Sequence, residues 1–354
     1  MTIDELTSQS VELLKQMIEI PSLSREEKEV ADYLEEVFSA WGLHPSRIHN
    51  NIWLRSKAWN DAKPVILLNS HIDTVRPASG WTYDPFRSTT EEDRITGLGS
   101  NDAGASVVSL LGTFRYFYDA EHLPFNLLYC ASAEEEISGE NGIASILDQL
   151  GRIDLAIVGE PTQMQIAVAE KGLLVLDCEA KGRAGHAARN EGENAIYKAI
   201  KDIEILEAYR FPLVSPVLGP VKLSVTQIEA GQQHNVVPDS CRFVVDLRTN
   251  EFYTNKEAFE IIAGLIQSQV HPRSLKLNSS GISVNHQIVK CGLDMGLHIY
   301  GSPTTSDQAV IPYPSIKMGP GDSARSHTAN EYILIQEIYE GIATYVKLLE
   351  ALRF

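Results

Sequence analysis

The sequence predicts an α/β fold into which a second, smaller α+β domain is inserted. Short apolar runs alternate with helical patterns over most of the chain, which is typical of helices packed on a mostly parallel sheet. From about Gly172 to Gly281, by contrast, the strands alternate apolar with polar residues, which is typical of a sheet with one buried face. We therefore expect one domain formed by residues 1–171 and 282–354, and an inserted domain formed by residues 172–281.

The elements of the larger domain are predicted from apolar spacing and from stop signals. The first helix stops near Pro21, and the second runs from about Arg25 to Trp41 and ends at Gly42. Three later segments also have helical spacing: Val107–Tyr118, Ile143–Leu150 and Ile335–Leu352. Four short apolar runs are the expected strands: Val65–Leu68, Phe125–Cys130, Leu155–Val158 and Ile316–Met318.

The inserted domain is predicted to contain half-buried strands with two helices on one face. Leu174–Cys178 and Arg242–Arg248 alternate apolar with polar residues, as such strands do. The two helical patterns run from about Asn194 to Tyr209 and from about Lys256 to Gln269.

Composition excludes several classes of partner. The net charge of −17 argues against binding to nucleic acid or to an anionic membrane, because both would be repelled. The N-terminus is acidic and amphipathic, so we expect neither a signal peptide nor a membrane span. The four cysteines lie far apart and form no Cys-x-x-Cys pair, which indicates buried free thiols in a reducing compartment. A cytoplasmic location is therefore expected.

Side chains that can bind metals follow each of the four predicted strands of the larger domain. His71 follows the first, Glu134–Glu136 the second and Glu160 the third, and His327 comes shortly after the fourth. Ligand sites in open α/β sheets lie beyond the carboxyl ends of the strands. Each residue alone has a structural explanation, such as a packed histidine, a turn or the start of a helix. Their common position at one edge of the sheet favours a metal site instead.

Asp73 has a distinct predicted role beside His71. Residues two apart on an extended strand point the same way, so the Asp73 carboxylate can accept a hydrogen bond from one ring nitrogen of His71. Such a partner fixes the tautomer of a metal-binding histidine and raises its basicity.

Five motifs follow one another along the chain: Ser70–Asp73, Gly97–Asp102, Glu134–Gly139, Gly159–Thr162 and Ser326–Thr328. This ordered set resembles the M20 family of metallopeptidases and deacylases, which contains acetylornithine deacetylase, succinyl-diaminopimelate desuccinylase and carboxypeptidase G2. The resemblance implies a zinc-exopeptidase-like, three-layer α/β/α catalytic domain with a ferredoxin-like dimerisation or lid domain inserted in it. This chain departs from the family pattern at two places. Relatives usually have Arg where this chain has Leu98, and they have a Lys or similar residue where it has Ala103 and Gly104. These differences weaken the assignment of the chain to one subgroup.

The resemblance also implies two divalent metal ions bridged by Asp102. His71 and Glu160 would complete one site, and Glu136 and His327 the other. Zinc is expected from the oxygen and nitrogen ligands, although Co²⁺ or Mn²⁺ could replace it. Glu135 would be the general base. The run of three glutamates leaves one alternative open, since a slip of one residue would make Glu134 the base.

The resemblance gives roles to three residues of the inserted domain. His186 would reach the active site of the partner subunit in a homodimer and polarise the scissile carbonyl, and Asn235 would support the same oxyanion site. Arg248 would pair with a substrate carboxylate, and an ion pair with Asp246 is an equally good alternative.

The expected substrate is a small acylated amino acid. Gly319 and Gly321 would offer backbone amides to its carboxylate, and Arg325 is a candidate anion contact. Gly319–Glu331 resembles acetylornithine deacetylase more than the desuccinylases, which predicts removal of an acetyl or succinyl group from an acyl-ornithine in arginine biosynthesis. A succinyl-diaminopimelate desuccinylase and a di- or aminopeptidase are the alternatives within the family. A dinucleotide-binding oxidoreductase, prompted by Gly97 and Gly99, and a catalytically inactive protein of the same fold are the alternatives outside it.

Overall fold

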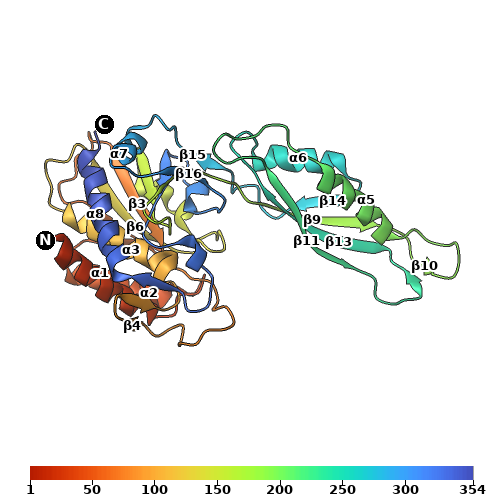
Figure 1. Ribbon diagram of the computed structural model, residues 1–354, viewed down its shortest axis with the longest axis horizontal. Helices are drawn as coiled ribbons and strands as arrows, with labels where there is room; N and C mark the ends of the chain where they lie inside the picture. Colours follow the sequence, from red (N-terminus) through yellow and green to blue (C-terminus); the bar gives the residue numbers. More distant parts are fainter. Residues whose placement is uncertain (354) are drawn as a thin grey trace. The chain divides into compact units, whose positions relative to one another are not determined.

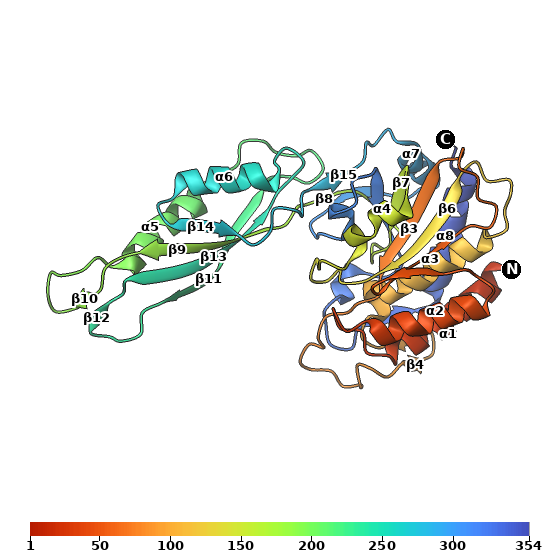
Figure 2. The ribbon, with the colours of Figure 1, turned by 180° about the vertical axis from the view of Figure 1, so that it is seen from behind.

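The computed structural model describes residues 1–353, and it has the predicted α/β architecture with an α+β insertion (Figures 1 and 2). The chain forms two compact units. The larger unit contains Met1–Val168, Gly281–Tyr300 and the chain from Ser306 onward, and the smaller contains Ala169–Ser280 and Gly301–Thr305. The division predicted from the sequence had its borders after residues 171 and 281 and left Gly301–Thr305 with the larger domain.

A nine-stranded sheet forms the centre of the larger unit, with the strand order β1-β2-β6-β3-β7-β17-β8-β15 and β16 paired to β8. Its strands are β1 (Ser46–Ile48), β2 (Asn51–Arg55), β3 (Val65–His71), β6 (Asn126–Ser132), β7 (Leu155–Val158), β8 (Ile166–Glu170), β15 (Ser280–Gly281), β16 (Ile299–Ser302) and β17 (Ser315–Lys317). The neighbours β6, β3, β7 and β17 run parallel to one another. They coincide with the four strands predicted from the sequence, so their carboxyl ends lie at the same edge of the sheet.

Both faces of this sheet are covered. Ile66 and Leu68 of β3 pack in one core with the long helices, whereas Val65 and Leu67 point into a second core. The helices of the first core are α1 (Ile3–Ile18), α2 (Lys28–Ala40), α3 (Ala105–Tyr116), α7 (Gln287–Asp294) and α8 (Ile335–Ala351). Since successive residues of a strand point to opposite faces, these buried runs belong to the middle layer of an α/β/α sandwich.

The second core is covered by a shorter helical segment than predicted. In place of one helix over Ile143–Leu150, the chain forms a 3₁₀ turn at Ile143–Ser145 and a single helical turn, α4 (Leu147–Leu150). Ile143, Ile146 and Leu150 are all buried in this core. The same apolar spacing is satisfied by two short turns, because Ile146 with φ −115° and ψ −1° interrupts the helix.

A three-stranded sheet of the larger unit lies close in sequence to the predicted site residues. It consists of β4 (Thr89–Glu91), β5 (Arg94–Thr96) and β18 (Tyr332–Leu334), in the order β18-β5-β4. Pairing of β18 with β5 brings the chain just after His327 next to the chain just before Asp102.

The smaller unit has the ferredoxin-like order of elements, in which two βαβ segments share an antiparallel sheet with the strand order β11-β13-β9-β14. Its elements are β9 (Leu174–Lys181), α5 (Ala195–Ala208), β11 (Lys222–Ala230), β13 (Ser240–Arg248), α6 (Asn255–Leu265) and β14 (Gln269–Pro272). Alternate residues of β9 and β13, such as Leu176 and Phe243, are buried in a core with both helices. A short pair, β10 (Gly185–His186) with β12 (Val236–Val237), is separate from this sheet.

Two expectations drawn from composition can be compared with the structure. The four cysteines, Cys130, Cys178, Cys241 and Cys291, are buried and free, as predicted. Among the helices of residues 1–353, none combines the length and the apolar character that a membrane span requires.

Candidate metal centre

The carboxyl ends of β6, β3, β7 and β17 bring the predicted metal ligands together. His71 is the last residue of β3 and is buried. Glu135 and Glu136 follow β6, and Glu160 follows β7. His327 arrives on the loop after β17, and Asp102 comes from the turn Ser100–Gly104 that leads into α3.

The Asp102 carboxylate lies between the two histidines. Its Oδ1 is 3.3 Å from Nε2 of His71, and its Oδ2 is 3.7 Å from Nε2 of His327. One oxygen therefore faces each histidine, which is the arrangement that a carboxylate bridging two cations needs.

Glutamates complete both sides of this arrangement. On one side, Nε2 of His327 is 3.0 Å from Oε2 of Glu136. On the other side, Nε2 of His71 is 3.7 Å from Oε1 of Glu160 and 3.9 Å from Oε2 of Glu135. Possible ligand atoms lie within 4.8 Å of one another in two sets, which share His71: one adds Asp102 and Glu136, and the other adds Glu135 and Glu160.

Glu134 faces away from the cluster. Its carboxylate accepts the backbone N–H of Asn141 at 3.1 Å and the Asn141 side-chain amide at 3.0 Å. Of the three successive glutamates, Glu135 and Glu136 are the two that face the histidines, which favours Glu135 over Glu134 as the base.

Asp73 supports the cluster in a different way from the one predicted. Nδ1 of His71 is 2.9 Å from the backbone carbonyl of Asp73 and 3.5 Å from its carboxylate, so the closer partner is the main chain. The Asp73 carboxylate instead accepts the backbone N–H groups of Glu135 at 3.0 Å and Glu136 at 3.2 Å, and the hydroxyl of Ser24 at 2.7 Å. The carbonyl contact leaves Nε2 of His71 free to bind a cation if Nδ1 carries the proton.

The crowded carboxylates change the protonation of the whole cluster. Burial, with the neighbouring Asp102 carboxylate, raises the pKa of Glu160 to about 8. Burial also raises the pKa of Glu135 well above its usual value. The hydrogen bond to Glu136 raises the pKa of His327 to about 9. Burial opposes protonation of His71, but Asp102 and Asp73 outweigh it and raise the His71 pKa well above its usual value.

This donor set fits a pair of divalent cations. Buried carboxylates that bind protons so strongly indicate a place where negative charge lacks compensation, and cations supply that compensation. The donors are imidazole nitrogen and carboxylate oxygen with no thiolate, which suits zinc and also permits cobalt or manganese.

Two buried acidic residues beside the cluster were not selected from the sequence. Glu331 accepts backbone N–H groups of the loop that carries Asp102. Asp307 accepts the side-chain amide of Asn69 at 2.8 Å and the hydroxyl of Ser132 at 2.7 Å, and burial raises the Asp307 pKa to about 6. Neither residue directly follows a predicted strand; Glu331 ends the segment Gly319–Glu331 compared with acetylornithine deacetylase, but nothing in that segment assigned it a role.

The three site residues predicted in the smaller unit are distant in sequence from this cluster, and each makes hydrogen bonds within the smaller unit. His186 is exposed on β10, and its Nδ1 accepts the backbone N–H of Ala188 at 3.1 Å. Arg248 makes a two-pronged ion pair with Asp246 at 2.8 and 3.0 Å, which is the structural alternative to substrate binding. Asn235 is exposed, and its carbonyl accepts the N–H of Ala187 at 3.0 Å.

The predicted substrate contacts after β17 also have partners within the protein. The amide of Gly319 donates to Oγ1 of Thr162 at 3.0 Å, so it has a partner other than substrate. Gly321 has φ +87°, and a Cβ there would lie 2.3 Å from Oδ1 of Asn101, so glycine is required for close packing. The Arg325 guanidinium pairs with Glu337 at 2.7 Å.

The sequence profile of Peptidase family M20/M25/M40 matches residues 67–351, which include every residue of the cluster. The chain belongs to this family. It is therefore a hydrolase of amide bonds in acylated amino acids or peptides. The Gly97–Gly99 segment, which prompted the dinucleotide-binding alternative, belongs to the loop that leads to Asp102.

Curated relatives of this chain carry different names. A [LysW]-lysine/[LysW]-ornithine hydrolase of Sulfurisphaera tokodaii is 29% identical over 96% of this chain and 95% of its own. A peptidase M20 domain-containing protein of Schizosaccharomyces pombe is 27% identical over 96% of this chain and 83% of its own. An acetylornithine deacetylase of Myxococcus xanthus is 25% identical over 78% of this chain and 77% of its own. The names of these relatives agree on no single substrate.

Solved structures share the fold over nearly the whole chain. Aminopeptidase PepT of Bacillus cereus superposes with a TM-score of 0.76 at 20% identity and covers 98% of both chains. The YXEP protein of Bacillus subtilis, described as a dinuclear metal binding peptidase of the M20 family, superposes with a TM-score of 0.71 at 17% identity over 98% of both chains. These matches confirm the predicted fold class.

Proposed function

We propose that the protein is a two-metal deacylase that removes the acyl group from an Nα-acyl amino acid, with an acyl-ornithine as substrate. The observation that carries the proposal is the position of Asp102, whose two carboxylate oxygens face His71 and His327 separately. His71, Asp102 and Glu160 would hold one ion, and Asp102, Glu136 and His327 the other. Zn²⁺ is the expected metal.

The protein residues then have defined tasks in the hydrolysis. The two ions, when bound, would lower the pKa of a water molecule and polarise the acyl carbonyl. Glu135 would take the proton of the attacking water and deliver it to the nitrogen of the leaving amine. The raised pKa of Glu135 suits a group that must both accept and release a proton near neutral pH. Asp73 would orient Glu135 through its backbone N–H.

We also propose that the smaller unit mediates a homodimer in which His186 contributes to the partner's site. An exposed imidazole with an N–H to donate fits the task of stabilising the developing oxyanion. Asn235, whose carbonyl binds the backbone of Ala187 next to His186, would assist it. Arg248 would contact a substrate carboxylate only if its ion pair with Asp246 opened or was shared.

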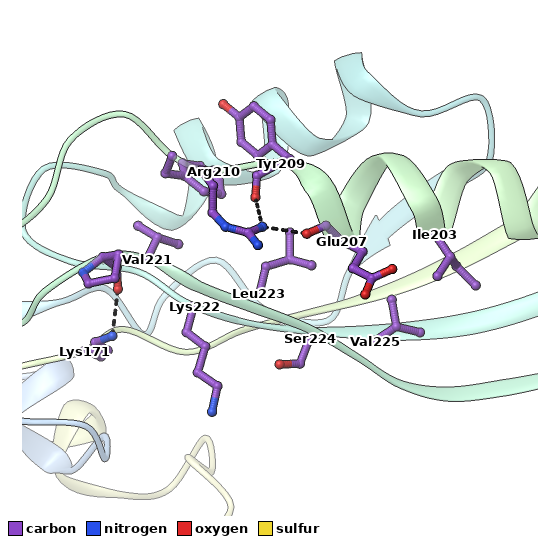
Figure 3. Close-up of a pocket in the computed structure, with 12 residues that line it drawn as sticks. Lys171, Ile203, Glu207, Tyr209, Arg210, Val221, Lys222, Leu223, Ser224 and Val225 are labelled. Atoms are coloured by element: carbon purple, nitrogen blue, oxygen red, sulfur yellow. Dashed lines mark hydrogen bonds between the residues drawn. The ribbon is translucent and has the colours of Figure 1, made fainter.

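The features that support a dimer are an unpaired strand edge and nearby apolar side chains. β11 is an edge strand whose residues are mostly exposed, and Ile228 on it is 56% exposed. On α5, Tyr197 and Ile200 are 66% and 42% exposed. Figure 3 shows a groove beside this edge, with Ile203 of α5 on one side and residues Lys222–Val225 of β11 on the other. Long unpaired edges commonly become interfaces.

Sedimentation equilibrium tests the dimer. Tyr197→Glu and Ile200→Glu should shift the protein toward monomer, because each places a charge on the proposed interface. Leu293→Glu changes an exposed leucine of α7 in the larger unit and should leave the mass unchanged. A monomeric wild-type protein at micromolar concentration would contradict this part of the proposal.

The substrate class is supported by sequence in the segment after β17 and by one relative. Gly319–Glu331 resembles acetylornithine deacetylase, and the Myxococcus xanthus protein of that name is among the relatives. The cluster's negative charge and the net charge of −17 are compatible with a product that carries an amine. In this interpretation the enzyme would act in arginine biosynthesis.

The deciding experiment measures release of free amine from a substrate panel by the zinc-reconstituted protein. The panel contains N-acetyl-ornithine, N-succinyl-ornithine, succinyl-diaminopimelate and several dipeptides, with a chelated control. Chelator-sensitive cleavage of an acyl-ornithine would support the proposal and identify the acyl group. Cleavage of dipeptides or of succinyl-diaminopimelate alone would move the protein to another branch of the same family. No metal-dependent cleavage of any substrate would contradict it.

A further inference from the structure

One buried carboxylate contacts the loop that carries Asp102 through the backbone. Glu331 directly precedes β18, and only 2% of its surface is exposed. Its Oε1 accepts the N–H groups of Asn101 at 2.9 Å and Asp102 at 2.8 Å, and its Oε2 accepts that of Gly99 at 3.2 Å. Its own carbonyl accepts the N–H of Gly97 at 3.0 Å. A single residue therefore provides acceptors for four backbone donors in the segment leading to Asp102.

The same loop is attached on its other side to the segment before His327. Oδ1 of Asn101 accepts the N–H of Asp322 at 3.0 Å. Its Nδ2 donates to the Asp322 carbonyl at 3.1 Å and to Oγ of Ser326 at 3.3 Å. The distance between the carboxylate of Asp102 and the imidazole of His327 thus depends on how this loop is held.

We propose that Glu331 is a positioning residue of the metal centre: by fixing the backbone of residues 99–102, it keeps the Asp102 carboxylate between His71 and His327. The inference rests on the proposed function, because it takes Asp102 as the bridging ligand. Glu331 itself faces backbone N–H groups and is assigned no contact with a metal ion. Groups that hold a metal ligand in its orientation contribute to the site without touching the ion. Their loss weakens metal binding even though every ligand remains.

Glutamine at this position tests the proposal with the smallest change in shape. A carboxylate has only acceptor oxygens, whereas the amide of glutamine replaces one of them with an NH₂ donor. In Glu331→Gln, the NH₂ group would take the place of one carboxylate oxygen. It would then face either the N–H groups of Asn101 and Asp102, which Oε1 now accepts, or the N–H of Gly99, which Oε2 now accepts. The loop would then have to move, and Asp102 would move with it.

The chain offers a matched control for a merely structural effect. Asp202 in the smaller unit is a carboxylate of similar burial, 3% exposed. It accepts the backbone N–H groups of Gln267 at 3.1 Å and Ser268 at 2.8 Å and the Ser268 hydroxyl at 2.6 Å. Asp202→Asn makes the same chemical change in the unit that contains none of the proposed metal ligands. It should lower the melting temperature without altering metal binding.

The experiment compares Zn²⁺ dissociation constants, measured by chelator competition, and the visible absorption of the Co²⁺-substituted protein. Melting temperatures in the presence of chelator report folding separately. Glu331→Gln should weaken the binding of at least one ion by about 10- to 100-fold and change the Co²⁺ spectrum. Asp202→Asn should leave both unchanged. A folded Glu331→Gln protein with wild-type Zn²⁺ affinity and an unchanged spectrum would overturn the proposal.

If Glu331→Gln does not fold, Glu331→Asp takes its place. It keeps the charge but withdraws the carboxylate by one methylene from the loop, so a smaller loss of Zn²⁺ affinity is expected, and wild-type affinity would overturn the proposal. Failure of the proposed two-metal site has a different signature, since the wild-type protein itself would then bind no Zn²⁺ at the cluster, and failure of the proposed substrate would appear only in the amine-release panel. Wild-type binding of two ions with unaffected Glu331 variants would contradict only the role of Glu331.

Discussion

The carboxylate of Asp73 holds the main chain of Glu135, whose N–H it accepts at 3.0 Å. The neighbouring N–H of Glu136 is accepted by the second oxygen at 3.2 Å, and the Asp73 carbonyl lies 2.9 Å from Nδ1 of His71. One residue therefore orients a proposed base and two proposed ligands. Burial alone would raise the Asp73 pKa, but the nearby His71 imidazole and the hydrogen bonds from Ser24 and Glu135 lower it, so the carboxylate is ionised at neutral pH.

Asp73→Asn should reduce kcat by about 10- to 100-fold, because the amide cannot accept every one of these hydrogen bonds and Glu135 loses its orientation. Steady-state kinetics and metal analysis on the same preparation check this. Ser24→Ala removes only the hydroxyl contact and should have a small effect. Equal activity of Asp73→Asn and wild type would show that the backbone of Glu135 does not depend on Asp73.

Glu135→Gln should retain metal and lose turnover by about 10²- to 10⁴-fold, since glutamine keeps the shape of the side chain but cannot accept a proton. Metal content and amine release are measured in parallel. The matched control is Glu134→Gln, the adjacent residue, whose carboxylate binds Asn141. If the control lost turnover and Glu135→Gln did not, the register of the three glutamates would be wrong.

The stability of the metal-free protein should fall as pH rises from 6.5 to 8. Burial raises the pKa of Glu160 from 4.5 to about 8, and the hydrogen bond with Glu136 raises that of His327 from 6.5 to about 9. In this pH range the folded state binds more protons than the unfolded state, so the free energy of unfolding decreases with increasing pH. Bound Zn²⁺ replaces those protons, and its stabilising effect should therefore increase with pH.

Differential scanning calorimetry at pH 6.5 and 8, with Zn²⁺ and with chelator, measures this effect. The increase in Tm caused by Zn²⁺ should be larger at pH 8. His327→Gln removes one of the groups whose pKa is raised and should reduce the pH dependence of the metal-free protein. An increase in Tm that is the same at both pH values would contradict the assigned protonation.

His186→Ala should lower turnover more than metal content, because the imidazole is proposed to stabilise the oxyanion and not to bind an ion. A decrease of kcat by about 10²- to 10³-fold with both ions retained is expected. His271→Ala, another exposed histidine of the smaller unit, is the control and should be close to wild type. Loss of metal in His186→Ala would contradict the oxyanion role.

The central part of the site could be predicted because its signals are local. β3, β6, β7 and β17 are short apolar runs, and a parallel sheet places their carboxyl ends together whatever their order along the chain. His71 and Glu160 were therefore expected at one edge from position alone. The resemblance to the family added Asp102, which lies in a turn before α3 instead of at a strand end.

The supporting contacts could not be predicted because they join distant segments. Glu331 lies 229 residues from Asp102 in sequence, and no periodicity links them. Arg325 was predicted to contact an anionic substrate from its place before His327, but its pairing with Glu337 of α8 depends on how the helix begins. Side-chain partners of this kind are decided by packing, which a single sequence does not specify.

The contacts of Asn101 have a consequence for attempts to change the enzyme's substrate preference by loop exchange. Residues 319–327 look like a self-contained cassette that could be taken from a relative with another substrate. In this protein the cassette is bound to Asn101 through Asp322 and Ser326, and the chain directly after it supplies Glu331. A chimera that replaced the cassette alone would separate it from both anchors. Transplanting residues 97–104 and 319–334 together would keep the donor's own contacts between these two segments.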